Sequence, residues 1–317
     1  MTGFRAEKNI YITVKKTLVH LFLIMASIFW GASFIITKQI FADEPNITVL
    51  QLLTFRLLLA SAVTIPLLVV TRQLEPMRRG DMKWFMLLAL SEPFLYSICE
   101  TNGVRFVSGS LASVIIATIP FFVAITNAYV YKERLRGVVL AGILLSLLGV
   151  SLMIAGDKAQ AVDTNANMAK GLLFLASAVA IAVVFTLILV KVSHNYRATT
   201  ITAYQNLIGC LYFLPVMLAV DGHSLASLHY TPRLLLLILS LGILCSTVAY
   251  MFYNHGVKHL GATAACVYAN TIPVFSFLVA LTIRQECFSW MKLVGIVMVV
   301  IGATMAQLPP SKKKDTI

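Results

Sequence analysis

Charged residues are scarce in this chain. Of its 317 residues only 12% are Asp, Glu, Lys or Arg, whereas 59% are hydrophobic. Soluble globular domains carry about twice that share of charge, and disordered segments are poor in hydrophobic residues, so both classes are excluded. The composition that remains is that of a protein which crosses a membrane several times.

The chain also lacks the patterns of several kinds of site. Its five cysteines lie in or beside apolar runs, with no CxxC pair and no histidine at metal-ligand spacing. This argues against a disulfide framework or a zinc site. No phosphate-binding loop supports direct use of ATP. We expect no cofactor, no metal and no enzymatic activity, because no convergent set of acids, histidines or metal ligands is found.

Ten apolar runs, each long enough to cross a bilayer as a helix, follow one another along the chain. They lie near residues 17–41, 47–70, 83–104, 108–131, 136–155, 168–191, 199–220, 232–255, 260–283 and 288–307. The connections between them leave no room for a soluble domain. The sequence therefore predicts an all-α integral membrane protein with ten transmembrane helices.

Basic residues are distributed unevenly between the connections. With the N-terminus in the cytoplasm, 17 of the 25 Lys and Arg residues fall on the cytoplasmic side, 7 fall on the other side, and Arg56 lies within a span. Cytoplasmic loops of membrane proteins accumulate Lys and Arg, so both termini are expected inside. This distribution accounts for the net charge of +12 without a nucleic-acid partner.

The two halves of the chain repeat each other at a constant offset of 153 residues. Ten identities fall in 36 aligned pairs, in which Val114, Thr118, Ile119, Pro120, Phe122, Glu133, Leu140, Gly142, Ile143 and Gly149 match Val267, Thr271, Ile272, Pro273, Phe275, Glu286, Leu293, Gly295, Ile296 and Gly302. The predicted repeats cover residues 17–155 and 168–307. Each holds five spans, an odd number, so the second copy enters the membrane inverted. Inverted repeats are typical of alternating-access carriers, and the alternative is a scaffold duplicated for stability or for a membrane enzyme.

Several of these residues resemble one family. The Phe29-Trp30-Gly31 run with Ser33 and Lys38, the charge at Arg56, the two Ile-Pro pairs and the acids Glu133 and Glu286 are similar to the EamA type of the drug/metabolite transporter superfamily. The resemblance covers residues 18–307. It implies a five-plus-five carrier in a bacterial inner membrane, with a central cavity lined mainly by spans one, three, four, six, eight and nine. It also implies export of amino acids or other small metabolites.

Three charged residues lie inside predicted spans: Arg56, Glu92 and Glu100. A charge at bilayer depth is costly, so it normally faces the bundle interior, pairs with another charge or serves transport. In a continuous helix Glu92, Tyr96 and Glu100 share one face, which we expect to line the cavity. Arg56 lies between the two acids in depth. We expect it to pair with Glu100, leaving Glu92 to take a proton or a substrate amine; a static ion pair that only fixes helix packing is the alternative.

Further polar and helix-breaking residues complete the predicted site. The remaining binding candidates are Trp30 and Ser33 in the first span, Tyr250 and Asn254 in the eighth, and Asn270 in the ninth. Pro120 and Pro273 lie mid-span in equivalent helices, where each removes a backbone donor. They are predicted hinges, with a static bend as the alternative.

These observations predict a secondary active transporter that exports amino acids or related metabolites by alternating access, with proton coupling left open. An uncoupled facilitator, an exchanger of anionic metabolites and, less favoured, a membrane-embedded enzyme are the alternatives. The expected partners are a small-molecule substrate and the lipid bilayer, with no nucleic acid. Gly142, Gly149, Gly295 and Gly302 suit close helix packing and offer a contact for a homodimer through the fifth and tenth helices.

Overall fold

The structure is a computed structural model that describes residues 2–130, 137–158, 165–261, 265, 268–283 and 286–306. Within these ranges every regular element is helical. In chain order the elements are α1 (Thr2–Asp43), α2 (Val49–Val70), α3 (Met82–Ala89), η1 (Leu90–Leu95), α4 (Tyr96–Phe106), α5 (Gly109–Ile116), α6 (Ile119–Val130), α7 (Gly137–Lys158), α8 (Asn165–Ser193), α9 (Ala198–Asp221), η2 (Gly222–Ser227), α10 (Pro232–Ser240), η3 (Leu241–Val248), α11 (Ala249–Leu260), α13 (Ile272–Thr282) and α14 (Trp290–Ala306).

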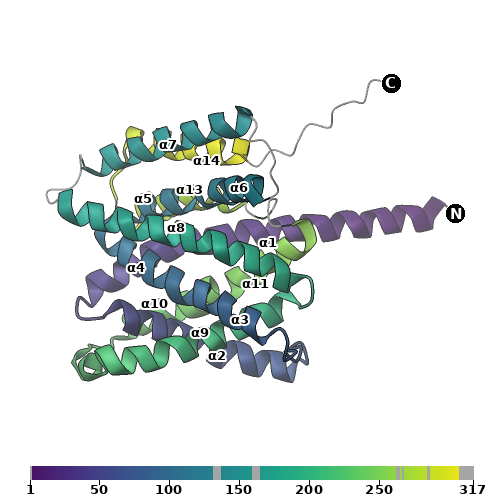
Figure 1. Cartoon of the computed structure of the whole chain (residues 1–317), viewed down its shortest axis with the longest axis horizontal. Helices are drawn as coiled ribbons and strands as arrows, with labels where there is room; N and C mark the ends of the chain where they lie inside the picture. Colours follow the sequence, from purple (N-terminus) through teal and green to yellow (C-terminus); the bar gives the residue numbers. More distant parts are fainter. Residues whose placement is uncertain are drawn as a thin grey trace.

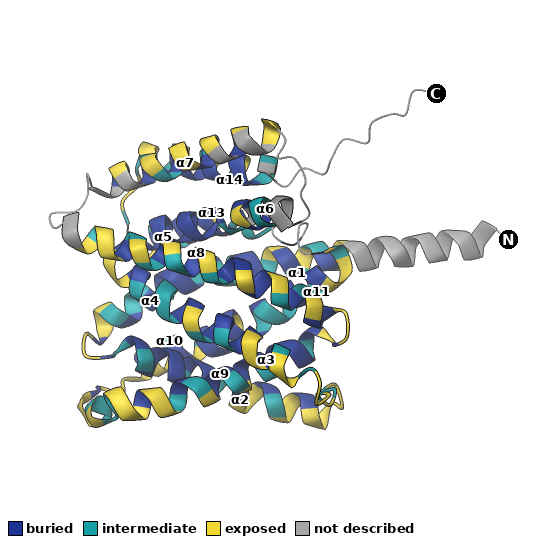
Figure 2. Ribbon diagram, viewed as in Figure 1, coloured by how far each residue is buried: buried dark blue, intermediate teal, exposed yellow. Residues whose placement is uncertain are grey.

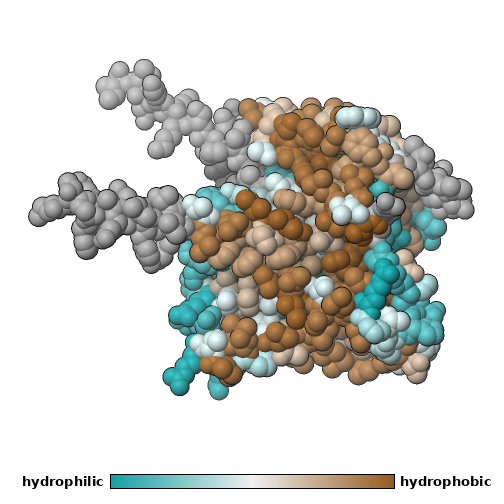
Figure 3. Space-filling view, turned by 180° about the vertical axis from the view of Figure 1, so that it is seen from behind, coloured by the Kyte–Doolittle hydropathy of each residue, from teal (hydrophilic) through white to brown (hydrophobic). Residues whose placement is uncertain are grey.

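The surface is that of a membrane protein. Five helical stretches of the described chain are long and apolar enough to cross a bilayer: Thr17–Asp43, Val49–Val70, Asn167–Ser193, Ala198–Ser227 and Pro232–Leu260. Shorter apolar helices lie beside them. In Figure 3 hydrophobic side chains form a broad band across the molecule, and hydrophilic side chains gather at the two sides where helices end. The predicted all-α membrane fold is confirmed.

Local sequence explains where individual helices begin. Thr48 starts α2 with a capping box: its hydroxyl accepts from the Gln51 backbone N–H at 3.1 Å, and the Gln51 side chain accepts from the Thr48 N–H at 3.0 Å. Thr231 and Ser108 cap α10 and α5 in the same way through one hydroxyl each. These bonds satisfy amide groups that have no partner inside the helix.

The helices pack with the internal symmetry that a two-repeat architecture requires. In Figure 1, α7 and α14 form the top layer, α2 and α9 form the bottom layer, and the other helices lie between them. Helix α1 packs against α11 and α13, whereas its counterpart in the second repeat, α8, packs against α4, α5 and α6. The beginning of α1 and the end of α14 lie on the same side of the bundle (Figure 1). An inverted duplication of five spans accounts for this arrangement.

Glycines fix the contact between α7 and α14. A Cβ on Gly149 would lie 2.6 Å from the Gly295 carbonyl oxygen, and a Cβ on Gly302 would lie closer still to that of Gly142. Adding 153 to Gly149 gives Gly302, and subtracting 153 from Gly295 gives Gly142, so the two contacts are equivalent in the two repeats. The predicted packing role of these glycines is thus met within one chain. A homodimer through the same helices stays a prediction, and it would use their outward faces, which are exposed along much of α7 (Figure 2).

Three spans are broken rather than continuous. The prediction of one unbroken helix over 83–104 is wrong, because Glu92 has φ −140° and ψ 121° and separates α3 from α4. The proline that follows it disfavours helical backbone at Glu92. In the second repeat the equivalent span, Pro232–Leu260, stays helical and changes only to π-helical turns over η3. Breaks also precede Pro120 and Pro273, since α6 begins at Ile119 and α13 begins at Ile272. Glu133, which the repeat comparison paired with Glu286, lies outside the described residues.

Candidate functional site

A cavity of about 100 Å³, measured as the space open to the centres of water molecules, lies where the two repeats meet. Its walls come from α1, α2, η1, α4, α5 and α6 of the first repeat and from α8, α11, α13 and the turn before α13 in the second. Seven of the nine predicted binding residues line it: Trp30, Ser33, Arg56, Glu92, Tyr96, Glu100 and Tyr250. The structure therefore gathers into one space side chains that are up to 220 positions apart in the sequence.

The other two predicted binding residues lie elsewhere. Asn254 is buried on α11 and donates from Nδ2 to the Thr202 hydroxyl at 3.0 Å, outside the central cavity. Asn270 is buried in the turn that precedes α13 and does not line the cavity either. Both asparagines lie in apolar spans, but their positions along the helix point them into helix contacts.

The two acids are each held by a tyrosine. Glu92 is 4% exposed and accepts a hydrogen bond of 2.5 Å from the Tyr250 hydroxyl, and the Ser97 hydroxyl lies 3.4 Å from both of its carboxylate oxygens. Glu100 accepts a hydrogen bond of 2.8 Å from the Tyr96 hydroxyl. Since Tyr250 belongs to the second repeat, the Glu92 carboxylate is bound across the interface between the repeats.

Arg56 does not make the predicted ion pair. Among the described residues no carboxylate lies within 4.0 Å of its guanidinium, and its Nε donates instead to the Ser246 hydroxyl. Helix α2 and η3 lie close together, since a Cβ on Gly242 would lie 2.7 Å from the Arg56 carbonyl oxygen, and this brings Ser246 within reach of the guanidinium. Arg56 still lines the cavity that holds both acids.

Helix α9 holds the backbone that presents Glu92. The Gln205 amide donates from Nε2 to the Glu92 carbonyl oxygen at 3.2 Å. One turn further on, Gly209 leaves room for the ring of Pro93, which a Cβ at that position would overlap. Pro93 accounts for the break after the fact, because proline disfavours helical backbone at the residue before it. Gln205 and Gly209 could not be predicted, because the sequence does not say which face of α9 turns toward η1.

Aromatic rings form another part of the cavity wall, and one of them, Tyr250, reaches the Glu92 carboxylate. The Trp30 ring lies 5.1 Å from the Tyr250 ring at 70° and 5.0 Å from the Tyr253 ring at 56°, both within the range of favourable aromatic contacts. Trp30 is fixed by a 3.2 Å hydrogen bond from Nε1 to the Cys245 carbonyl oxygen. Sequence reasoning missed Tyr253 and Phe185 as lining residues; aromatic residues in apolar spans carry no mark that separates cavity from core.

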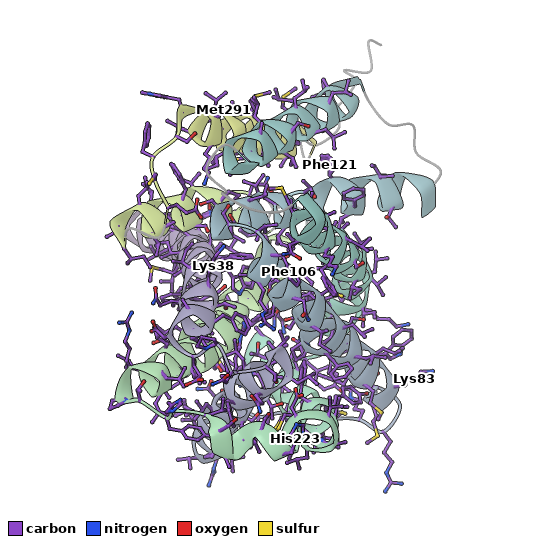
Figure 4. All side chains as sticks on the ribbon, turned by 90° about the vertical axis from the view of Figure 1, so that its left-hand side faces the viewer. Lys38, Lys83, Phe106, Phe121, His223 and Met291 are labelled. Atoms are coloured by element: carbon purple, nitrogen blue, oxygen red, sulfur yellow. The ribbon has the colours of Figure 1, made fainter. Side chains whose placement is uncertain are left out.

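Contacts between the repeats hold both ends of the bundle. At the end where α1 finishes, the Phe106 and Phe174 rings stack 6.5 Å apart, beside a 2.6 Å hydrogen bond within the first repeat from the Lys38 ammonium to the Val107 carbonyl oxygen. Figure 4 shows Lys38 and Phe106 side by side at this end. At the opposite end the Phe22 and Phe252 rings stack 4.4 Å apart. Each stack joins a helix of one repeat to a helix of the other.

Comparison with known proteins assigns this architecture. The model of the EamA-like transporter family matches residues 17–155 and 169–307. The chain belongs to the EamA-like transporter family. Among curated relatives, the uncharacterized transporter YcxC of Bacillus subtilis (strain 168) is 27% identical over 94% of this chain and 96% of its own length. The uncharacterized transporter YetK of the same strain is 25% identical over 82% of this chain and 78% of its own.

A solved structure supports the same fold for this EamA-like chain. One crystal structure superposes with a TM-score of 0.67 at 17% identity, covering 92% of this chain and 96% of the other. Together with the family match and the apolar helices, this makes the protein a multi-pass membrane transporter. The EamA-like cavity holds two carboxylates and one guanidinium, beside aromatic and aliphatic walls.

Proposed function

We propose that this protein is a secondary active transporter that exports an amino acid or a related small amine by alternating access, in exchange for a proton taken by Glu92. One observation carries the proposal. The cavity lies between two inverted repeats, and its deepest carboxylate is bound by a tyrosine from the opposite repeat. A movement of one repeat against the other must therefore alter the surroundings of Glu92, which couples its proton to the movement.

The lining favours a substrate with both polar and apolar parts. Glu92 and Glu100 offer carboxylates to an ammonium group, and Arg56 offers a guanidinium to a carboxylate. Trp30 and Tyr250 offer ring faces and edges to the remainder of the molecule. Two acids against one arginine make the cavity unfavourable for a purely anionic metabolite, which counts against the anion exchanger.

The distribution of charge supports an orientation in the bacterial inner membrane. Basic residues gather at the end of the bundle where α1 begins. They are Arg72, Arg78, Arg79, Lys83, Lys191, Arg197 and Lys258. The opposite end carries fewer: Lys38, Arg105, Lys170, Arg233 and Lys292. We place the first end, and with it both termini, in the cytoplasm.

Reconstituted vesicles test the proposal. Protein in vesicles of phosphatidylethanolamine and phosphatidylglycerol would be given a tritiated mixture of the twenty L-amino acids, with the interior one pH unit more acidic than the bath. One exchanged proton then supplies about 1.4 kcal/mol, enough for about tenfold accumulation. Glu92→Gln is expected to lose this accumulation. Glu75→Gln, which alters an acid at the surface outside the cavity, is expected to keep it.

Three other results would contradict the proposal. Equal uptake with and without the pH gradient, unchanged by Glu92→Gln, would identify an uncoupled facilitator. Exchange of an anionic metabolite without uptake of any amino acid would identify the anion exchanger. Turnover of a lipid or an amide by the purified protein would identify a membrane enzyme.

A further inference from the structure

A second, smaller space lies behind Glu92. It offers about 10 Å³ to the centre of a water molecule, which is about the room that one water needs, and it is bounded by α2, η1, α4, α9, η3 and α11. Three residues, Arg56, Glu92 and Tyr250, line both this space and the central cavity. They form a partition, so Glu92 can be reached from two directions. We call the smaller space the side chamber.

The side chamber has polar walls from α9, α4 and η3 and a largely apolar wall from α2. Its polar lining includes Ser97, Thr202, Gln205, Asn206 and Ser246. Thr202 is the fifth residue of α9, which places it about 6 Å along the helix from the end proposed to be cytoplasmic. Leu53 and Leu57 line the chamber from the half of α2 nearer the opposite end. The polar path thus leads from Glu92 along α9 toward the cytoplasmic end.

Two buried amide oxygens along this path lack a donor. Gln205 is 3% exposed, and its Oε1 has no hydrogen-bond partner among the described residues, although its Nε2 is bonded to the Glu92 carbonyl. Beyond Thr202, Asn254 is fully buried, and its Oδ1 has no partner within the described chain. An unsatisfied buried acceptor is unfavourable, and small polar spaces in proteins hold water for this reason.

The charges around the chamber favour water over a metal ion. Arg56 on α2 lines the chamber, and its positive charge opposes a bound metal cation there. The other titratable side chains that face Glu92 are Tyr250 from α11 and, across the partition, Tyr96 and Glu100 from α4. Helix α9 presents only uncharged side chains to the chamber. A neutral ligand with both donors and acceptors suits this lining.

We propose that the side chamber binds water that carries the coupling proton between Glu92 and the cytoplasmic end, by a route separate from the substrate cavity. The Glu92 O–H bond breaks as a water oxygen takes the proton, and that water releases a proton to the next acceptor toward Thr202, so no other reactant is needed. This route rests on the proposed proton-coupled function. It would allow Glu92 to exchange its proton while substrate occupies the central cavity.

Two transport modes separate this route from the function itself. Gradient-driven uptake requires net proton movement, whereas counterflow at equal pH, the exchange of labelled for unlabelled amino acids, does not. Thr202→Val and Asn206→Leu make the chamber less polar. Both are expected to lose the accumulation of about tenfold that one pH unit supplies and to keep counterflow of the amino-acid mixture within about twofold of wild type. Thr202→Ser, which keeps the hydroxyl, should restore accumulation.

The matched control is Thr54→Val. Thr54 is as buried as Thr202, and its hydroxyl likewise bonds to the carbonyl four residues earlier, but it lines neither space. It should behave as wild type in both modes. Full accumulation by Thr202→Val and Asn206→Leu would overturn the side-chamber route and leave the proposed function standing. Loss of counterflow in the same variants, or accumulation driven by a sodium gradient, would also overturn it. A wild-type protein without any response to pH would overturn both.

Discussion

Glu92 lies at a break in the backbone, bonds across the interface between the two repeats, and lines both internal spaces. Its carbonyl oxygen is held by Gln205, its carboxylate is held by Tyr250, and the proline after it breaks the helix. Polarity in an apolar span was enough to find Glu92, Glu100 and Arg56 in the sequence. The partner of Arg56 was not predictable, because depth along two helices says nothing about which faces turn toward each other.

A second acid, Glu44, gives a prediction for stability outside the membrane-spanning segments. Burial on its own would raise the pKa of Glu44, but hydrogen bonds from the backbone N–H groups of His229 and Asn46, together with smaller contributions from the His229 imidazole, outweigh it and lower the pKa below its ordinary value of 4.5. A lowered pKa in the folded state contributes stability above the ordinary value, and that stability is lost as the pH falls through the folded value. Glu44→Gln should therefore be less stable than wild type at pH 7, with the difference shrinking below about pH 4.5.

Unfolding midpoints in detergent across this pH range would check the Glu44 prediction. His229→Gln is the matched control, because it removes the imidazole and keeps the backbone N–H that donates to Glu44 at 3.1 Å. It should retain most of the pH dependence. Equal stability of Glu44→Gln and wild type at every pH would show that these bonds contribute nothing.

The site is positioned by helices that were predicted as continuous spans but are broken in the structure. Pro93, Pro120 and Pro273 account for these breaks, because proline removes a donor and restricts the residue before it. No proline lies within η3, at the position equivalent to η1, and there the helix continues through π-helical turns without a break. The break at Glu92 is therefore a difference between the two repeats.

The contact of α9 with η1 gives a prediction about packing. Replacing glycine by alanine inside a helix normally stabilises a protein by about 0.4–1 kcal/mol. At Gly209 the added methyl group would overlap the ring of Pro93, and overpacking of this kind costs about 1–3 kcal/mol. We expect Gly209→Ala to lower the unfolding midpoint and also to reduce uptake, since it displaces the backbone at Glu92.

Gly222→Ala is the control for this substitution, since the atom nearest to its new methyl group would be 3.9 Å away. Chemical unfolding followed by circular dichroism compares the two variants directly. If Gly209→Ala proved as stable as Gly222→Ala, the fit of α9 against Pro93 would not matter for the fold.

For the whole molecule, the offset of 153 predicted more than any single motif. It predicted two inverted five-span bundles, and the structure shows contacts that repeat at that offset. The Ser146 hydroxyl lies 3.4 Å from the carbonyl oxygen of Val299, its own equivalent in the other repeat. A residue that meets its equivalent lies close to the axis that relates the repeats. The size of the cavity and the identity of its aromatic walls depend on helix rotations, which the offset does not contain.

Alternating access requires the two ends of this bundle to open in turn. The stacked pairs Phe22–Phe252 and Phe106–Phe174 join the repeats at opposite ends, so a carrier must separate them in turn. In a variant without the five native cysteines, each pair would be replaced by two cysteines and oxidised. Ser146→Cys with Val299→Cys provides a third bond close to the axis, where little movement is required.

Uptake of the tritiated amino-acid mixture by these three disulfide-bonded proteins is the measurement that tests the account most directly. The account predicts that either end disulfide stops uptake, that reduction restores it, and that the bond near the axis leaves it intact. Undiminished uptake with both end disulfides formed in one molecule would contradict it.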